Sequence, residues 1–280
     1  MSLQHINALI TGASGGIGAA VATGILQRGG RAVLTARDPR SLKELAHTID
    51  PSNDRTISIS ADVTISEDRR RICELAHTWQ GGVNTLVNIA GVGDFGLFES
   101  ERRDEIDRAF DVNVLAPVKL CHALLPHLSR QRQAHIVNLG SVFGAIGYPG
   151  HAVYSATKFA LRGFSEALRR ELIDTSVRVH YLAPRATRTK FNSSAVNALN
   201  ELLGIAVDPP ERVADALCAL LETGTAESVI GWPEKFFVRL NALLPRIVDR
   251  SLAKQLPAIR QHARSKADTL PIQSFSRRAS

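Results

Sequence analysis

Three side chains in the middle of the sequence have the types and spacing needed for proton transfer at an oxygen atom. Tyr154 is followed four residues later by Lys158 and is preceded thirteen residues earlier by Ser141. Residues four apart share one face of a helix, so the phenol and the ammonium point the same way. A free phenol titrates near pH ~10, and a neighbouring ammonium favours its phenolate. The pair indicates an acid or base that acts on an oxygen, although an isolated pair of this kind is also explained by a surface helix.

A glycine-rich turn near the N-terminus could bind phosphate. Residues 7–11 predict a short buried strand, which runs into this turn and then into an apolar-periodic helix. Glycines let the backbone approach a pyrophosphate closely, and the helix N-terminus offers unpaired N–H groups. We expect the contacts to come from Gly12, Ser14, Gly16, Ile17 and Gly18. The alternative is a tight strand-to-helix turn without a ligand.

The spacing Thr-Gly-x-x-x-Gly-x-Gly together with Tyr-x-x-x-Lys resembles the short-chain dehydrogenase/reductase family in its single-domain form. The resemblance covers about residues 5–232, and further segments match the family in order. Asp62 and Val63 end the third predicted strand, where the family's Asp meets the adenine edge. Asn88, Ala90 and Gly91 resemble the family's Asn-Asn-Ala-Gly turn, with Ile89 as a mild departure. Asn113, Ser141, Tyr154 and Lys158 fall where the family carries its four catalytic residues.

The resemblance implies a role for each of the four. Tyr154 is the general acid in carbonyl reduction or the base in alcohol oxidation, and Lys158 lowers its pKa and holds the nicotinamide ribose. Ser141 orients the carbonyl, and Asn113 anchors a water that links Lys158 to solvent. Taken singly, Ser141 could merely cap a turn and Asn113 could satisfy a buried carbonyl.

The loop after the sixth predicted strand departs from the family pattern. The family usually has Pro-Gly there, whereas this chain has Pro184 followed by Arg185. Thr189 keeps its place five residues after the proline, and Pro184, Thr187 and Thr189 are expected near the cofactor. We expect Arg185 to face solvent; the alternative is contact with an anionic group of cofactor or substrate. A loop of altered shape is also expected, because glycine adopts backbone angles that are costly for arginine.

The predicted architecture is an α/β fold, a Rossmann-type doubly wound parallel sheet with a C-terminal helical extension. Apolar runs without alternation are typical of strands buried on both faces. Seven strands in the order 3-2-1-4-5-6-7 are expected at residues 5–11, 31–36, 56–61, 84–89, 134–140, 177–183 and 227–230. We expect a catalytic domain at 1–232, a basic amphipathic extension of the same domain at 233–268 and a disordered tail at 269–280.

The end of the second strand bears on the choice of cofactor. An acidic residue there would favour NAD, whereas arginine accommodates the 2′-phosphate of NADP. Arg37 follows the strand, and Asp38 is expected to cap the next helix. The sequence therefore predicts a preference for NADP(H) over NAD(H), because a guanidinium suits a phosphate.

Positive charge is concentrated at the C-terminus. Residues 235–280 carry a net charge of +8 and residues 1–234 a net charge of −1, which together give the formal net charge of +7. Apolar residues recur among the cations up to Arg264. Pro245 and Pro257 are expected to break this segment into short amphipathic helices. The helices could pack on the protein beside the substrate cleft, pack in an oligomer or lie on an anionic membrane surface, and we favour packing on the protein. Nucleic acid is not an expected partner, since the basic segment has few interleaved aromatic residues.

Three separate cysteines and no Cys-x-x-Cys argue against a disulfide framework or a zinc site, and no metal is expected. The sequence lacks a signal-peptide pattern and a bilayer-length apolar run. We therefore expect a cytoplasmic protein that is soluble or bound at most to a membrane surface.

The substrate is the least constrained expectation. Residues 191–207 predict a mixed helix with apolar residues, which suits a lid over a hydrophobic alcohol or ketone with a lipid-like or acyl chain. Relatives in the family are usually dimers or tetramers, and residues 112–128 and 152–173 are the candidate pairing helices. A catalytically idle dinucleotide-binding sensor or scaffold is the alternative function. A serine hydrolase is less well supported, because Ser141 does not lie in Gly-x-Ser-x-Gly.

Overall fold

The computed structural model describes residues 2–267. Seven strands form one parallel sheet in the order β3-β2-β1-β4-β5-β6-β7, as predicted. The strands are β1 (Asn7–Thr11), β2 (Arg31–Ala36), β3 (Thr56–Ser60), β4 (Thr85–Asn88), β5 (Ala134–Leu139), β6 (Val177–Ala183) and β7 (Glu227–Val229). The predicted strands are confirmed to within two residues at each end. The five inner strands are largely apolar and buried, whereas β3 and β7 at the sides of the sheet are partly exposed. The expected tail at 269–280 lies outside the described residues.

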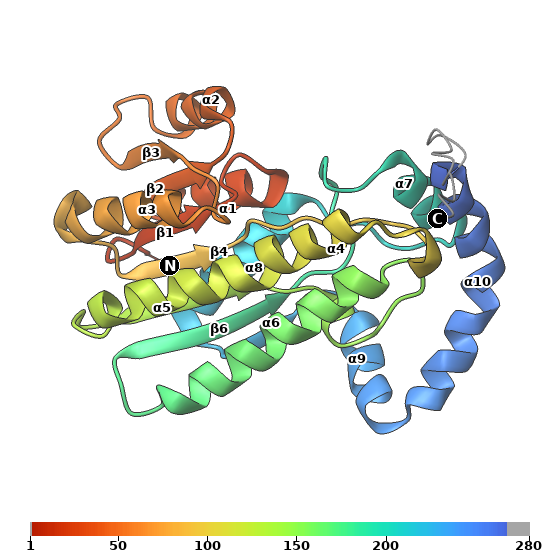
Figure 1. Cartoon of the computed structure of the whole chain (residues 1–280). Coiled ribbons are helices and arrows are strands. Elements are labelled where there is room, and N and C mark those ends of the chain that lie inside the picture. The colour runs from red at the N-terminus through yellow and green to blue at the C-terminus, as the bar shows by residue number, and fades with distance from the viewer. Residues whose placement is uncertain (1, 268–280) are drawn as a thin grey trace, which may run out of the picture.

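Helices cover both faces of the sheet (Figure 1). They are α1 (Gly16–Gln27), α2 (Pro39–Ile49), α3 (Ser66–Thr78), α4 (Arg103–Phe110), α5 (Ala116–Leu128), α6 (Ala152–Glu171), α7 (Ser194–Leu202), α8 (Pro210–Thr223), α9 (Glu234–Leu243) and α10 (Pro245–Ala267). A single π-helical turn, Asp111–Leu115, joins α4 to α5. No helix in the described part of the chain is long and apolar enough to cross a membrane.

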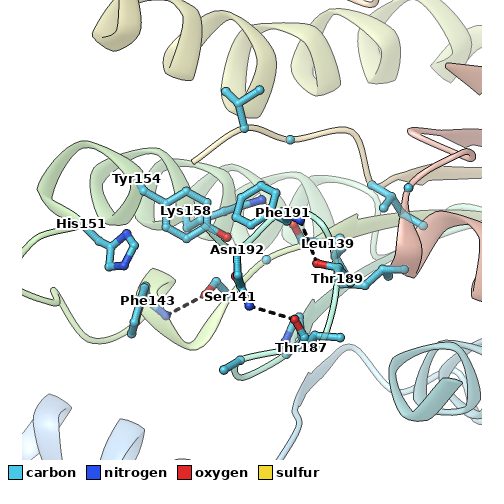
Figure 2. A pocket seen from close by; sticks show the side chains of 18 of the residues that line it. Leu139, Ser141, Phe143, His151, Tyr154, Lys158, Thr187, Thr189, Phe191 and Asn192 are labelled. Carbon is cyan, nitrogen blue, oxygen red and sulfur yellow. Dashed lines mark hydrogen bonds between the residues drawn. The ribbon is translucent and has the colours of Figure 1, made fainter. Parts of the chain in front are cut away.

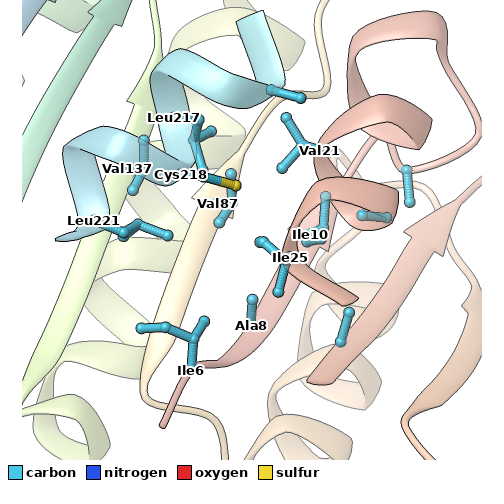
Figure 3. Close-up of a cluster of buried hydrophobic side chains, with 14 of the residues drawn as sticks. Ile6, Ala8, Ile10, Val21, Ile25, Val87, Val137, Leu217, Cys218 and Leu221 are labelled. Atoms are coloured by element: carbon cyan, nitrogen blue, oxygen red, sulfur yellow. The ribbon is translucent and has the colours of Figure 1, made fainter. Parts of the chain in front are cut away.

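Alternate residues of the five inner strands, β1, β2, β4, β5 and β6, contribute to two separate cores. Ala8 and Ile10 of β1 pack against α1 and α8, with Val87, Val137 and Leu182 from neighbouring strands (Figure 3). Leu9 points to the opposite face, where α3, α5 and α6 cover it. This alternation holds β1 between two helical layers.

The three cysteines are buried in these cores and form no disulfide. Burial raises the pKa of the Cys121 thiol to about 12 and that of the Cys218 thiol to about 11. The pKa of Cys73 is raised for the same reason. All three thiols are therefore protonated and poorly nucleophilic near neutral pH.

The direction of chain progression reverses between β1 and β4, which lie side by side with Thr11 opposite Asn88. Helices on the two sides of this point diverge, and a crevice opens beyond the carboxyl ends of the strands. The hydroxyl of Thr11 accepts hydrogen bonds from the backbone N–H groups of Ile89 and Ala90, at 3.0 and 3.1 Å. These bonds fix the two loops that border the crevice.

The C-terminal extension forms a helical hairpin of α9 and α10 that projects beyond the carboxyl edge of the sheet (Figure 1). Its inner side packs on the domain: Val238 and Val248 contact Val142 and Ile146, and Ile259 contacts Phe95. The preferred expectation, packing beside the cleft, is confirmed for this inner side. The predicted break at Pro257 is wrong, because Pro257 lies within α10 on its exposed side, where a carbonyl without its partner can bond to water.

Candidate active site

A cavity of about 1160 Å³ occupies the crevice at the carboxyl ends of the strands. Small-molecule sites typically measure about 300–1000 Å³, so this one has room for a dinucleotide together with a substrate. The glycine turn after β1 lies at one end, and Tyr154, Lys158 and Ser141 line the middle. Aromatic and aliphatic side chains from the loop before α6, from α7 and from the α9–α10 hairpin line the other end.

Tyr154 and Lys158 project from successive turns of α6 toward Ser141 (Figure 2). Lys158 Nζ donates a hydrogen bond to the carbonyl of Leu139 at 2.9 Å and lies 5.6 Å from the centre of the Tyr154 ring. Ser141 Oγ accepts a hydrogen bond from Phe143 N at 3.1 Å, and Ser141 also hydrogen-bonds Tyr154. The three side chains therefore meet on one wall of the cavity.

Burial is the main cause of the shifted pKa values of Tyr154 and Lys158. It raises the pKa of Tyr154 to about 12, although the hydrogen bond with Ser141 offsets part of the effect. It lowers the pKa of Lys158 to about 8, since the ammonium loses water and gains only a neutral carbonyl. Burial therefore outweighs any lowering of the Tyr154 pKa by Lys158, whose ammonium donates to Leu139 O and lies 5.6 Å from the centre of the Tyr154 ring. Tyr154 is thus a protonated phenol that can donate.

Asn113 stands in the π-helical turn between α4 and α5, a feature that recurs at functional sites. Its side-chain amide donates to Val92 O at 2.8 Å and to Thr157 Oγ1 at 3.0 Å, and it accepts from Val92 N at 2.8 Å. Asn113 is buried and does not line the cavity. Its side chain therefore fixes the segment after β4 against α6, and both of its amide protons are already bonded.

The glycine turn fits a phosphate group. Gly12 has φ +67°, and a Cβ there would lie 2.8 Å from the Cα of Ala90. A Cβ at Gly16 would lie 2.7 Å from the methyl group of Thr189, so the loop after β6 rests on this turn. Helix α1 begins without a side-chain cap and without an acidic residue in its first turn. Its first N–H groups and positive dipole end are thus available to an anion.

The sequence model of the family described as short chain dehydrogenase matches residues 6–200. An uncharacterized oxidoreductase of Bacillus subtilis, YxnA, is 34% identical over 88% of this chain and 71% of its own length. This chain belongs to the short-chain dehydrogenases.

One further sequence relative and two solved structures are similar to this chain. The ketoacyl reductase HetN of Nostoc is 27% identical to this dehydrogenase over 86% of each chain. A crystal structure of 3-ketoacyl-(acyl-carrier-protein) reductase from Brucella melitensis, complexed with NADH, has a TM-score of 0.75 and 28% identity, and it covers 81% of this chain and 96% of that one. A short-chain dehydrogenase/reductase from Burkholderia phymatum in complex with NAD has a TM-score of 0.78, 85% coverage of this chain and 92% of its own.

Most of the residues predicted for cofactor binding lie along the dehydrogenase's cavity. They are Gly12, Ser14, Gly16, Ile17, Gly18, Arg37, Asp62, Val63, Ala90, Gly91, Tyr154, Lys158, Pro184, Thr187 and Thr189. Asn88 does not line this cavity: its amide donates to Asn138 Oδ1 at 2.9 Å and so ties β4 to β5. Asp38 caps α2 as predicted, by accepting from the backbone N–H groups of Arg40 and Ser41 at 3.1 and 3.3 Å.

The expectation that Arg185 faces solvent is wrong. Its guanidinium is 12% exposed and forms a two-fold ion pair with Asp208, with N–O distances of 2.8 and 2.9 Å. It also pairs with Glu234 of α9 at 3.2 Å. Arg185 does not have a positive φ, so the backbone angles that only glycine adopts easily are not used here. Arg185 therefore joins three segments that meet beside the cavity.

Among other residues of the site, Tyr181 and His151 carry no motif and were missed from the sequence, whereas Phe191 begins the segment 191–207 that was expected to form a lid. The hydroxyl of Tyr181 in β6 lies 3.4 Å from Ser141 N and 3.4 Å from Lys158 O, so it bridges the two segments that hold the catalytic side chains. His151 lines the cavity three residues before Tyr154, and burial lowers its pKa to about 4. Its Nδ1 lies 2.9 Å from Asp94 O, which only accepts, so Nδ1 is protonated. Phe191 approaches the ring of Tyr154 to 5.9 Å between centroids. Among residues 2–267, no cluster of three or more His, Cys, Asp and Glu residues is arranged to hold a metal ion.

Proposed function

We propose that this short-chain dehydrogenase is an NADP(H)-preferring oxidoreductase that interconverts a hydrophobic ketone and the corresponding secondary alcohol. The observation that carries the proposal is the placement of Tyr154, Ser141 and Lys158 between the glycine turn and the apolar end of one cavity. A nicotinamide bound along the turn would supply or accept the hydride. The chain itself supplies binding, orientation and the proton.

Tyr154 donates the proton to the carbonyl oxygen during reduction, since burial keeps its phenol protonated. Ser141 holds the same oxygen through its hydroxyl and so fixes the carbonyl against the phenol. Lys158 is mostly protonated at pH 7, because its lowered pKa of about 8 still lies above neutrality. Its charge favours the phenolate that Tyr154 becomes after donation. Tyr154, Ser141 and Lys158 are the catalytic residues of this proposal, and Asn113 orders the segment beside them.

Arg37 supports the preference for NADP(H). It follows β2 directly and is exposed at the cavity. Its charge lies close enough to Asp62 to lower the pKa of that carboxyl group. The nearby acid, Asp38, is engaged as the cap of α2, so it is a poor partner for a ribose hydroxyl. A guanidinium at this place suits a 2′-phosphate.

The far end of the cavity supports a hydrophobic substrate. Ile146, Phe191, Leu199, Phe237 and Leu252 line it. The resemblance to the Nostoc ketoacyl reductase and to the Brucella 3-ketoacyl-(acyl-carrier-protein) reductase makes a 3-ketoacyl compound the first candidate.

Exposed apolar side chains on α6, just after α6 and before α5 support a homodimer or homotetramer. Leu115 is 42% exposed, Phe159 44% and Ile173 73%. Paired helices related by a two-fold axis would cover them. Light scattering on the purified protein measures the assembly. A cytoplasmic location remains a prediction.

The test is calorimetric titration with NADPH and NADH, followed by NADPH consumption on ketones and 3-ketoacyl thioesters of graded chain length. Tighter binding of NADPH and turnover that rises with chain length are expected. Turnover confined to small polar ketones would contradict the proposed substrate class. Tight binding without turnover on any ketone or alcohol would favour the sensor alternative.

A further inference from the structure

The outer side of the α9–α10 hairpin exposes a cluster of large apolar side chains. Trp232 is 72% exposed, Phe236 49%, Leu243 79%, Leu244 53% and Ile247 49%. The ring of Phe236 lies 6.4 Å from that of Trp232 and 5.8 Å from that of Phe237. Single exposed apolar residues are ordinary, but several large ones on one helical hairpin, three of them aromatic rings close together, mark an interaction site.

Helix α9 is apolar on two opposite sides. Val238 and Asn241 face the domain, where Val238 packs against Val142 and Asn241 donates to Ala145 O at 2.9 Å. Phe236 and Leu243 lie seven residues apart and share the other side of the helix, whereas Leu240 is partly buried against the domain beside Val238. Phe236 and Leu243 on that side are exposed in the structure of residues 2–267. A surface helix normally presents polar residues there, so this side is built to meet an apolar phase.

Exposed cations surround the apolar cluster. Arg246, Arg250 and Lys254 are four residues apart along one side of α10, and Lys235 and Arg239 lie on α9. In the described part of the chain, none of these five cations forms an ion pair. The acids between residues 232 and 256 are Asp249, which is exposed, and Glu234, which pairs with Arg185. We call these five apolar and five basic residues the hairpin surface.

The charge decides between the partners that an apolar surface can have. A two-fold contact between identical copies pairs the same patch with itself, so it would bring five cations of each copy close to five of the other, with Asp249 as the one exposed acid between residues 232 and 256. An anionic bilayer offers the complementary arrangement: its headgroups attract Lys and Arg, and its interface accepts Trp and Phe.

We propose that the hairpin surface binds the interface of a membrane that contains anionic lipid. The opposite side of the same hairpin lines the cavity through Phe237, Val248 and Leu252. A bound membrane would therefore lie one helix away from the apolar end of the cavity. Lipid binding is independent of the proposed chemistry, so a dehydrogenase inactive on ketones would still bind.

The experiment is flotation of the full chain with vesicles of phosphatidylcholine alone and with vesicles in which phosphatidylglycerol replaces part of it. Binding to the anionic vesicles is expected to be at least about tenfold stronger, and salt near ~0.5 M should weaken it. Phe236→Ser/Leu243→Ser should lower binding about tenfold by removing the apolar contacts. Arg246→Gln/Arg250→Gln should do so by removing charge.

Arg130→Gln/Arg132→Gln is the matched control. It removes the same charge from exposed positions in the turn between α5 and β5. This turn lies at the amino ends of the strands, away from the hairpin (Figure 1). This variant should bind anionic vesicles as the unchanged protein does. Circular dichroism and the melting temperature verify that each variant is folded, and all substituted residues are exposed.

Two results would overturn the proposal. One is the absence of binding to anionic vesicles, or equal binding by the hairpin variants and the control. The other is a dimer in light scattering that Phe236→Ser/Leu243→Ser converts to a monomer, without vesicle binding by the unchanged protein. That result would assign the surface to a second copy of the chain.

Discussion

The guanidinium of Arg185 lies 3.2 Å from the carboxylate of Glu234, so the loop after β6 is joined to the first turn of α9. The same guanidinium holds Asp208, whose side chain is 5% exposed. The Arg185 guanidinium keeps the pKa of Asp208 below its usual value, so this carboxylate is charged throughout the neutral range. Arg185 thus connects the loop after β6, the segment before α8 and the α9–α10 hairpin.

Arg185→Ala should lower the free energy of unfolding by about 2–4 kcal/mol, because it leaves a buried carboxylate with only Arg212 as a partner. Glu234→Gln should cost less, since the amide still accepts a hydrogen bond. Chemical denaturation measures both. Arg28→Ala is the comparison, because its partner Asp215 is 68% exposed and the loss should stay below about 1 kcal/mol. Equal stability of Arg185→Ala and the unchanged protein would show that the cluster is energetically neutral.

Tyr154→Phe should reduce kcat by about a thousandfold or more, because the proton donor is lost while the ring remains. Cofactor affinity in calorimetry should be unchanged. Tyr181→Phe removes a hydroxyl that supports Ser141 N and Lys158 O, and it should reduce kcat by about tenfold with little change in KM. Turnover retained by Tyr154→Phe would refute its assignment as the donor.

Arg37→Asp should shift cofactor preference from NADP(H) toward NAD(H). The substitution replaces a cation that suits the 2′-phosphate with an anion that repels it. The ratio of kcat/KM for the two cofactors is the measurement, and a change of about a hundredfold is expected. An unchanged ratio would place the determinant elsewhere.

Gly16→Ala should weaken cofactor binding by about tenfold or more, since its Cβ would lie 2.7 Å from the methyl group of Thr189. Thr189→Ser removes that methyl group and keeps the hydroxyl. The double variant should recover part of the affinity in the same calorimetric titration. Absence of any recovery would mean that the added methyl group meets the ligand and not the loop.

Stability should fall as the pH drops below about 6.5, the ordinary pKa of histidine. Burial lowers the pKa of His135 to about 3 and that of His151 to about 4. At a pH between these values and about 6.5, both side chains are therefore neutral in the folded protein and protonated in the unfolded chain. Their contribution is complete above the unfolded pKa and is lost as the pH falls toward the folded value. Denaturation at pH 7.5 and pH 5 measures the slope, and His135→Gln should reduce it. A slope unaffected by this substitution would assign acid sensitivity to other groups.

Much of this arrangement could be predicted from local patterns. Ala32 to Leu34 form an apolar run that is typical of a strand buried on both faces, and Tyr154 and Lys158 share a helix face because they are four residues apart. Arg185 could not be placed in this way, because its partners Asp208 and Glu234 follow 23 and 49 residues later in the chain. The lowered pKa of Lys158 was likewise hidden, since it arises from burial by segments distant in sequence.

The burial of Cys73, Cys121 and Cys218 has a practical consequence for work on the hairpin. Thiols that are shielded and protonated react slowly with maleimides, so the native cysteines can be left in place during labelling. A cysteine introduced at the exposed Ala242 of α9 would then be the main site of attachment for an environment-sensitive dye. Emission from such a dye would report in real time whether the helix sits in water or among acyl chains.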